Sequence, residues 1–195
     1  MKKIFLTLVF AASLAGCAQL QSFETGVKNA YSIITASAIT PQQAYIAINV
    51  FDGVEATATL YNKWPLCNGT ISACRKPAIR QQIKKLVLAG RVARNDVKAY
   101  MRANPGQNLN IKSFDDLKAA TNALQDIITA LEVWVPIIIQ EYNALKQPVL
   151  NVIAALRGNG EITTDQLDQL DKIEAQLDAD FDTSSAADDT EEASN

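Results

Sequence analysis

The side chains that most often carry chemistry in proteins are scarce in this chain. Its 195 residues include no His and only three Cys, and the Gly-x-Ser-x-Gly, P-loop, Gly-x-Gly-x-x-Gly and His-Glu-x-x-His motifs are absent. General acid or base catalysis would fall to carboxylates, Lys or Tyr. Glu132, set among apolar residues, is one such candidate. A single carboxylate on a core helix is more often a paired residue, so we expect no enzyme, no cofactor and no metal site.

One cysteine stands directly behind a short apolar segment. Lys2 and Lys3 precede an apolar run over residues 4–14, and Leu-Ala-Gly leads from this run into Cys17. About 11 apolar residues are too few to span a bilayer as a helix, but they suit the middle of a signal peptide. The charged start, the apolar run and Leu-Ala-Gly-Cys together resemble the lipobox of bacterial lipoproteins.

The resemblance covers residues 1–17 only. It implies that residues 1–16 are removed as a signal peptide and that Cys17 becomes the lipidated first residue of a short tether, 17–21. Lipoproteins of this kind carry a diacylglyceryl group on sulfur and usually an acyl chain on the new amino group. Two or more chains give a stable membrane anchor. Ala18 follows in place of Asp, which resembles lipoproteins sorted to the outer membrane and facing the periplasm.

The other two cysteines, Cys67 and Cys74, fall in a loop predicted between two helices. If lipidation consumes Cys17, these two thiols remain in an oxidising compartment, where we expect them to form a disulfide. The ring is short, so its stabilisation is at most about 2.5 kcal/mol. A redox or metal site is the alternative. Six residues between the cysteines are not a redox spacing, and no His is present to complete a metal site.

Basic residues crowd the segment 75–102, which contains nine of them and one acidic residue, Asp96. Seven lie within about 40° of one line on a helix: Lys76, Arg80, Lys84, Arg91, Arg94, Lys98 and Arg102. We call them the basic stripe. Three interpretations stay open: a solvated face, pairing with the chain's own acidic segment 165–192, or binding of an external anionic surface such as lipid phosphates or an acidic partner. Nucleic acid is not expected, because no aromatic residues interleave with the stripe to stack on bases.

The hydrophobic pattern predicts an all-α fold, an antiparallel bundle of four to five helices that includes one long kinked helix. No segment alternates as a strand does. Helices are expected over residues 22–38, 40–63, 77–103, 113–156 and 164–181. Thr40, Pro41 and Gln43 favour a capping box at the second start, as do Thr163 and Gln166 at the fifth. One side of the second helix is predicted to face the core: Ala47, Phe51, Val54, Ala58 and Tyr61.

The fourth segment has the longest pattern. Apolar residues recur at alternating spacings of four and three from Leu117 to Leu156, which favours knobs-into-holes packing in a bundle. Ser113 is a candidate N-cap, and Pro136 and Pro148 predict kinks. Residues 127–139 are almost wholly apolar, which favours a buried core helix over a membrane span. They could instead line an apolar ligand cavity around Trp134.

The domain organisation follows from these segments. Residues 22–181 form one helical bundle domain, and the acidic segment 182–195 is predicted to be disordered because it lacks large apolar residues. The function indicated is a membrane-anchored periplasmic lipoprotein with a structural or interaction role in the cell envelope. The alternatives are a helical binding module for a lipid or small apolar ligand, and an envelope-protection lipoprotein of the kind found on prophages.

Overall fold

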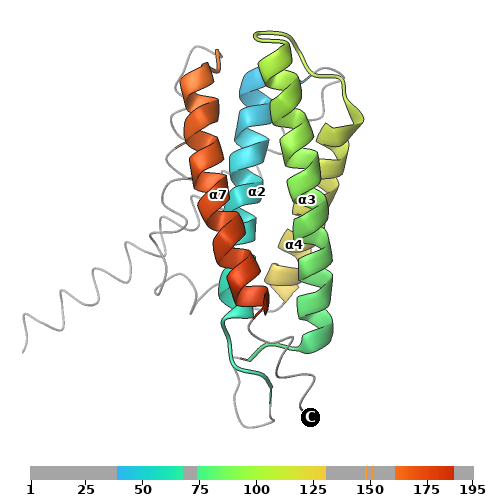
Figure 1. Cartoon of the computed structure of the whole chain (residues 1–195). Helices are drawn as coiled ribbons and strands as arrows, with labels where there is room; N and C mark the ends of the chain where they lie inside the picture. Colours follow the sequence, from blue (N-terminus) through green and yellow to red (C-terminus); the bar gives the residue numbers. More distant parts are fainter. Residues whose placement is uncertain (1–38, 68–73, 131–147, 149–150, 152–160, 187–195) are drawn as a thin grey trace, which may run out of the picture.

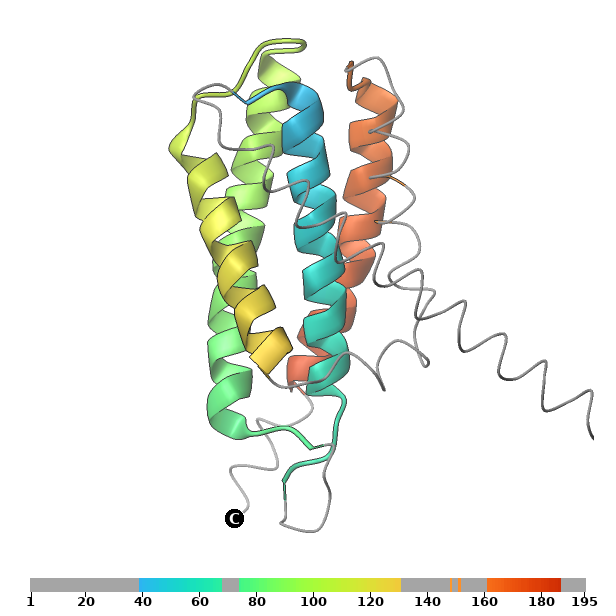
Figure 2. The same ribbon diagram turned by 180° about the vertical axis from the view of Figure 1, so that it is seen from behind.

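The computed structural model describes residues 39–67, 74–130, 148, 151 and 161–186, which form four helices packed together (Figures 1 and 2). These are α2 (Pro41–Asn62), α3 (Pro77–Ala103), α4 (Lys112–Ala130) and α7 (Thr164–Ala186). Across the described residues there is no strand, only two isolated β-bridges. The all-α prediction is confirmed. Figure 1 shows α2, α4 and α7 running in one direction and α3 in the other, so the bundle also contains parallel neighbours.

Helix α2 begins where its capping residues predict. The Thr40 side chain accepts a hydrogen bond from the Gln43 backbone, while the Gln43 side chain accepts one from the Thr40 backbone at 2.9 Å. Pro41 fills the first helical position, where its missing N–H costs nothing. This reciprocal cap fixes the helix start, and with it the position of every side chain that α2 presents.

Helix α2 forms the centre of the bundle. Every residue from Ala44 to Asn62 is buried, because α3, α4 and α7 all pack on it. The predicted inner face is indeed in the core, but the rest of the helix is buried as well. Several of its short polar side chains donate to carbonyls of the preceding turn: Asn49 donates to the Tyr45 carbonyl, and Thr57 donates to the Gly53 carbonyl. Because these residues are polar, the sequence predicted only one buried face for α2.

Gly90 brings α3 close to α2. A Cβ at this position would overlap the ring of Phe51, which is fully buried. The absence of a side chain therefore lets the middle of α3 approach α2. The next turn of α3 carries Arg91 and Arg94, and both reach carboxylates of α2. Gly90 thus helps to position the charged side chains described below.

The connection from α3 to α4 begins with a turn, in which the Gln107 N–H donates to the Asn104 carbonyl. Helix α3 spans the predicted residues, and Gly106 adopts a φ of 74°, a conformation that favours glycine. Ile39 and Leu109 exchange backbone hydrogen bonds across the end of the bundle. Helix α4 starts one residue before Ser113, so the predicted N-cap is wrong. The Ser113 hydroxyl instead donates to Asp96 of α3 at 3.1 Å.

Helix α7 starts after Thr163, which forms the predicted reciprocal bonds with Gln166. It continues to Ala186, so the prediction of disorder from residue 182 is wrong for residues 182–186. Tertiary contacts account for the extension, because Asp182 pairs with Arg91 and the Ser185 carbonyl accepts a hydrogen bond from Arg80. Composition alone could not reveal these partners.

Several predicted features lie outside the described residues. They are the helix at 22–38, most of the long segment beyond Ala130 with Glu132, Trp134 and Pro136, and the tail from residue 187. Within the described part of that long pattern, Leu117, Thr121 and Leu124 are fully buried. Asn151 is helical and buried, and its side chain donates to Asn49 of α2 at 2.9 Å.

Candidate functional site

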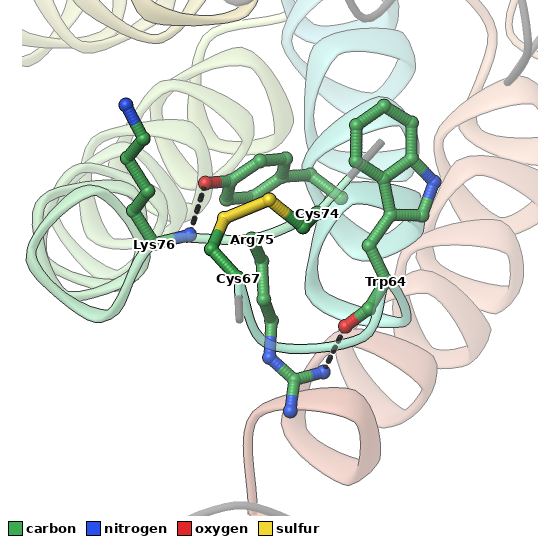
Figure 3. The surroundings of a disulfide bond; sticks show 6 residues. Trp64, Cys67, Cys74, Arg75 and Lys76 are labelled. Atoms are coloured by element: carbon green, nitrogen blue, oxygen red, sulfur yellow. Dashed lines mark hydrogen bonds between the residues drawn. A yellow bond between two sulfur atoms is a disulfide. The ribbon is translucent and has the colours of Figure 1, made fainter. Parts of the chain in front are cut away.

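Cys67 and Cys74 form a disulfide in the connection between α2 and α3, with their Cα atoms 4.9 Å apart (Figure 3). The same segment is held by the backbone, since the Cys67 N–H donates to the Arg75 carbonyl and the Arg75 N–H donates to the Pro65 carbonyl. The disulfide therefore constrains a connector that hydrogen bonds also close.

Arg75 anchors this connector to the end of α2. Its buried guanidinium donates to the carbonyls of Asn62, at 2.6 Å, and Trp64, at 2.5 Å (Figure 3). A cation beside the free carbonyls of a helix C-terminus is favoured by the helix dipole. The Lys76 backbone N–H also donates to the Tyr61 hydroxyl at 2.8 Å. The connector thus donates hydrogen bonds to the Asn62 and Trp64 carbonyls and to the Tyr61 hydroxyl.

The C-terminal part of the basic stripe faces α7. Arg102 contacts Asp168 at 3.3 Å and Asp171 at 2.5 Å, while Lys98 contacts Asp171 at 2.8 Å and also Glu174. Each cation lies between two consecutive acidic residues of α7. Residue numbers fall along α3 as they rise along α7, because the two helices are antiparallel.

The same pattern continues along the two helices toward the other end. Arg94 contacts Glu174 at 3.4 Å and Asp178 at 2.9 Å, and Arg91 contacts Asp178 at 3.0 Å and Asp182 at 2.8 Å. We call the four cations of α3 and these acidic residues of α7 the ion ladder. It joins α3 and α7 over several helical turns through long side chains.

Two carboxylates of α2 also contact the cations of the ion ladder, on the side that faces the core. Asp52 lies 2.9 Å from Arg94, and Glu55 lies 2.7 Å from Arg91 and 3.2 Å from Arg94. The side chains of Asp52 and Glu55 are 0% exposed, and that of Arg94 is 1% exposed. The innermost ion pairs are therefore sealed from solvent.

Aromatic rings support the two innermost guanidinium groups. Arg94 lies 5.5 Å from the ring centroid of Phe51 on α2, and Arg91 lies 5.1 Å from that of Phe181 on α7. A cation over an aromatic face is attracted electrostatically, most strongly where water is excluded. The rings thus offset part of the cost of removing these cations from water.

The ladder and the two α2 residues contain more negative groups than positive ones, with seven carboxylates facing four cations. Burial raises the pKa of Glu55 to about 7, although Arg94 and Arg91 oppose the rise. Burial also raises the pKa of Asp52 well above its usual range, against the attraction of Arg94. Protonation of these carboxyl groups is favoured because burial disfavours the charged form, and the neighbouring carboxylates add to this effect.

Sequence reasoning did not assign a role to Asp52 and Glu55. They are the sole acidic residues in α2, they are three apart on one face, and the helix contains no Lys or Arg. Carboxylates in such an apolar helix need cations from elsewhere. On α7 the acidic residues of the ladder recur at spacings of three and four, which matches the basic stripe. Together, these two patterns could have predicted that α2 and α7 supply the carboxylates that pair with the basic stripe.

Of the three interpretations of the basic stripe, the structure shows internal pairing for Arg91, Arg94, Lys98 and Arg102. Arg80 donates to the Ser185 carbonyl of α7. Lys76 is exposed and Lys84 is half-buried. Binding of an external anionic surface stays a prediction, and the buried guanidinium groups of Arg91 and Arg94 are poorly placed for it.

The described residues contain neither a membrane-spanning helix nor a metal-binding group of side chains. No described helix combines the length and apolar character needed to cross a bilayer. The described residues also contain no group of three or more side chains arranged to hold a metal ion.

Residues 1–18 match the model for the prokaryotic membrane lipoprotein lipid attachment site. The chain is a membrane-anchored bacterial lipoprotein. The match includes Cys17, the predicted lipidation residue, which lies outside the described part of the structure. No curated protein and no solved structure matches the lipoprotein significantly.

Proposed function

We propose that the lipoprotein is a non-catalytic structural or interaction component of the cell envelope. The observation that carries the proposal is the burial of the innermost ion pairs. The carboxyl groups with the most strongly raised pKa values, Asp52 and Glu55, have fully buried side chains that contact Arg91 and Arg94. A catalytic acid or base must reach its substrate. These groups serve instead to hold three helices in register.

A rigid bundle suits a protein that works by being held in place. The ladder ties α7 to α3, the α2 carboxylates tie both to the centre, and Arg75 ties the connector to the end of α2. The outer surfaces of α3 and α4 are then presented in a fixed arrangement. An anchored surface of this kind favours contact with another envelope component.

We further propose that the lipid anchor lies in the outer membrane and that the bundle faces the periplasm. Ala18 after the lipidated cysteine supports this location. Density-gradient fractionation of the wild type should place the protein with outer-membrane markers. The matched variant Ala18→Asp should move it to inner-membrane fractions, and Cys17→Ser should release it from both. Recovery of the wild type with the inner membrane would contradict the location.

The interaction role is tested by photo-crosslinking in intact cells. A photoreactive residue is placed at exposed positions of the full lipidated chain, such as Ala119 and Asn122 of α4 and Val92 of α3. We expect discrete adducts with a defined component of the envelope at some of these positions. The Cys17→Ser chain, which keeps the bundle but loses the anchor, should lose them. Absence of adducts at every exposed position would overturn the interaction role.

A further inference from the structure

The outer face of α3 contains an apolar patch. Leu88 is 47% exposed and Val92 is 64% exposed, and they are the large hydrophobic residues that stand out on the described surface. They lie one turn apart, so their side chains are neighbours on the helix. Ala89 and Ala99 are also exposed on this side and leave room for a close approach.

Two opposite charges lie on the same edge of this patch. At 100° per residue, Lys85 and Asp96 are about 20° apart around the helix, and both are exposed. They are 11 residues apart, or about 16 Å along the axis, so they cannot pair with each other. Among the described residues neither takes part in an ion pair, and Asp96 accepts a hydrogen bond from Ser113.

These positions are self-complementary in an antiparallel arrangement. The midpoint between Leu88 and Val92 is position 90, and the midpoint between Lys85 and Asp96 lies half a residue further. A twofold axis through this point brings Leu88 beside Val92 of a second copy. The same axis brings Lys85 beside Asp96 of that copy, and symmetry makes each contact twice. Residues on one edge of a helix meet the same edge of an antiparallel partner.

We propose that the outer face of α3 binds a second copy of this chain, as an antiparallel α3–α3 pair centred near Gly90. This inference rests on the proposed interaction role and names one partner for it. The occupant is identified by charge complementarity, because the axis that joins the apolar residues also pairs both charges. An unrelated partner would not require that coincidence.

The contact is small for a dimer in free solution. Helix α3 has 27 residues and is about 40 Å long, and stable interfaces bury roughly 800 Å² on each partner. The lipid anchor changes this condition, because it holds all copies at one membrane and raises their effective concentration. The pairing is therefore expected at the membrane and weak in the released protein.

Crosslinking in intact envelopes tests the pair. Cys67 and Cys74 are joined and Cys17 is predicted to be lipidated, so Val92→Cys in the full chain supplies the reactive thiol. Across the axis, position 92 lies about 6 Å along the helix from its mate. A short bifunctional maleimide should give a covalent dimer. Ala103→Cys is the matched control on the same helix, because its mate lies about 40 Å away.

Charge reversal decides whether the pairing has this geometry. In the Val92→Cys chain, Lys85→Glu or Asp96→Lys alone should lower the dimer yield about tenfold, since each creates two like-charge contacts. Together the two reversals restore opposite charges and should restore the yield. A yield unchanged by single reversals, a double variant no better than the singles, or equal crosslinking at position 103 would overturn the pair. A monomer that still forms adducts with another envelope component would leave the proposed function standing.

Discussion

Helices α4 and α7 both pack on the pair formed by α2 and α3, but they do so with different chemistry. Helix α4 buries apolar residues and one threonine, whose hydroxyl bonds within its own helix. Helix α7 buries a narrow apolar stripe and sets the acidic residues of the ion ladder beside it. Apolar contact stabilises without fixing direction, whereas the ladder defines register because each cation lies between two carboxylates.

Helix α7 shows how a strongly polar helix can pack into a bundle. The apolar stripe of α7 is narrow, so hydrophobic burial against α2 is limited. Without α7, the cations Arg94 and Lys98 of α3 would lose their carboxylate partners on that helix. The acidic face of α7 is therefore complementary to the basic face of α3. Buried ion pairs add little net stability compared with apolar packing, but breaking one is costly. Changes at the two interfaces should therefore differ in size and in their dependence on salt and pH.

Arg94→Met should be the most damaging change. It leaves Asp52, Glu55 and Glu174 buried without their shared cation, and the unfolding free energy should fall by about 3–5 kcal/mol. Urea denaturation followed by circular dichroism measures it. Adding Asp52→Asn to Arg94→Met should recover part of the loss, because it removes one uncompensated charge. Simple additivity of the two changes would show that Arg94 acts through packing alone.

Leu124→Ala tests the apolar interface of α4. Leu124 is fully buried, and its truncation should cost about 2–5 kcal/mol through lost burial and a cavity. In contrast to a ladder variant, this loss should be the same at low and high salt. The measurement is urea denaturation at two salt concentrations. A strong salt dependence of the Leu124→Ala effect would contradict the division between the two interfaces.

Gly90→Ala should destabilise the approach of α3 to α2. In a helix, alanine is more favourable than glycine by about 1 kcal/mol. Its Cβ would overlap Phe51, however, and overpacking costs about 1–3 kcal/mol. Thermal unfolding should show a net loss of stability. Phe51→Leu in the same chain supplies space and should reduce the penalty. A more stable Gly90→Ala protein would mean that the close approach is not needed.

The pH dependence should reveal the buried carboxyl groups. Glu55 has a pKa of about 7 in the folded chain and about 4.3 when unfolded, so between these values the folded state binds more protons. The unfolding free energy should therefore fall, by on the order of 1–3 kcal/mol, as pH rises from about 5 to about 7.5. Glu55→Gln should flatten this dependence, as urea denaturation at several pH values would show. A wild type that gains stability over this range would contradict the raised pKa.

Asp171 should act in the opposite direction. Although burial opposes it, hydrogen bonds from Lys98 and Arg102 lower the pKa of Asp171. The stabilising contribution of Asp171 is complete above its unfolded pKa and is lost as pH falls through its lower folded pKa. Stability should consequently decline again in strongly acidic solution. This decline separates the outer ladder from the buried pair on α2.

Arg102→Gln should have the smallest effect. The Arg102 side chain is 35% exposed and its partners Asp168 and Asp171 are 58% and 42% exposed. Exposed ion pairs contribute about 0–1 kcal/mol and weaken as salt rises. Denaturation at low salt should show this small loss, which added salt should remove. A loss as large as that of Arg94→Met would show that the ladder acts as one unit.

Local signals account for much of the fold that could be predicted. Thr40 with Gln43 and Thr163 with Gln166 marked two helix starts, because each pair satisfies backbone groups within one turn. Helix α3 likewise spans the predicted residues 77–103, and Gly106 follows its end with a φ of 74°. The Ser113 cap failed because a tertiary partner, Asp96, binds its hydroxyl.

The sequence alone determined the membrane anchor, the all-α class and the cysteines that could pair, because each depends on neighbours along the chain. Three features depend on tertiary structure: which acidic residues pair with the basic stripe, how far α7 extends, and why position 90 requires glycine. Coulomb pairing, burial and steric overlap depend on distances in space, and Arg94 meets Asp52 and Asp178 from positions far apart in the chain. Patterns of charge indicated that a partner was needed, but only packing identified it.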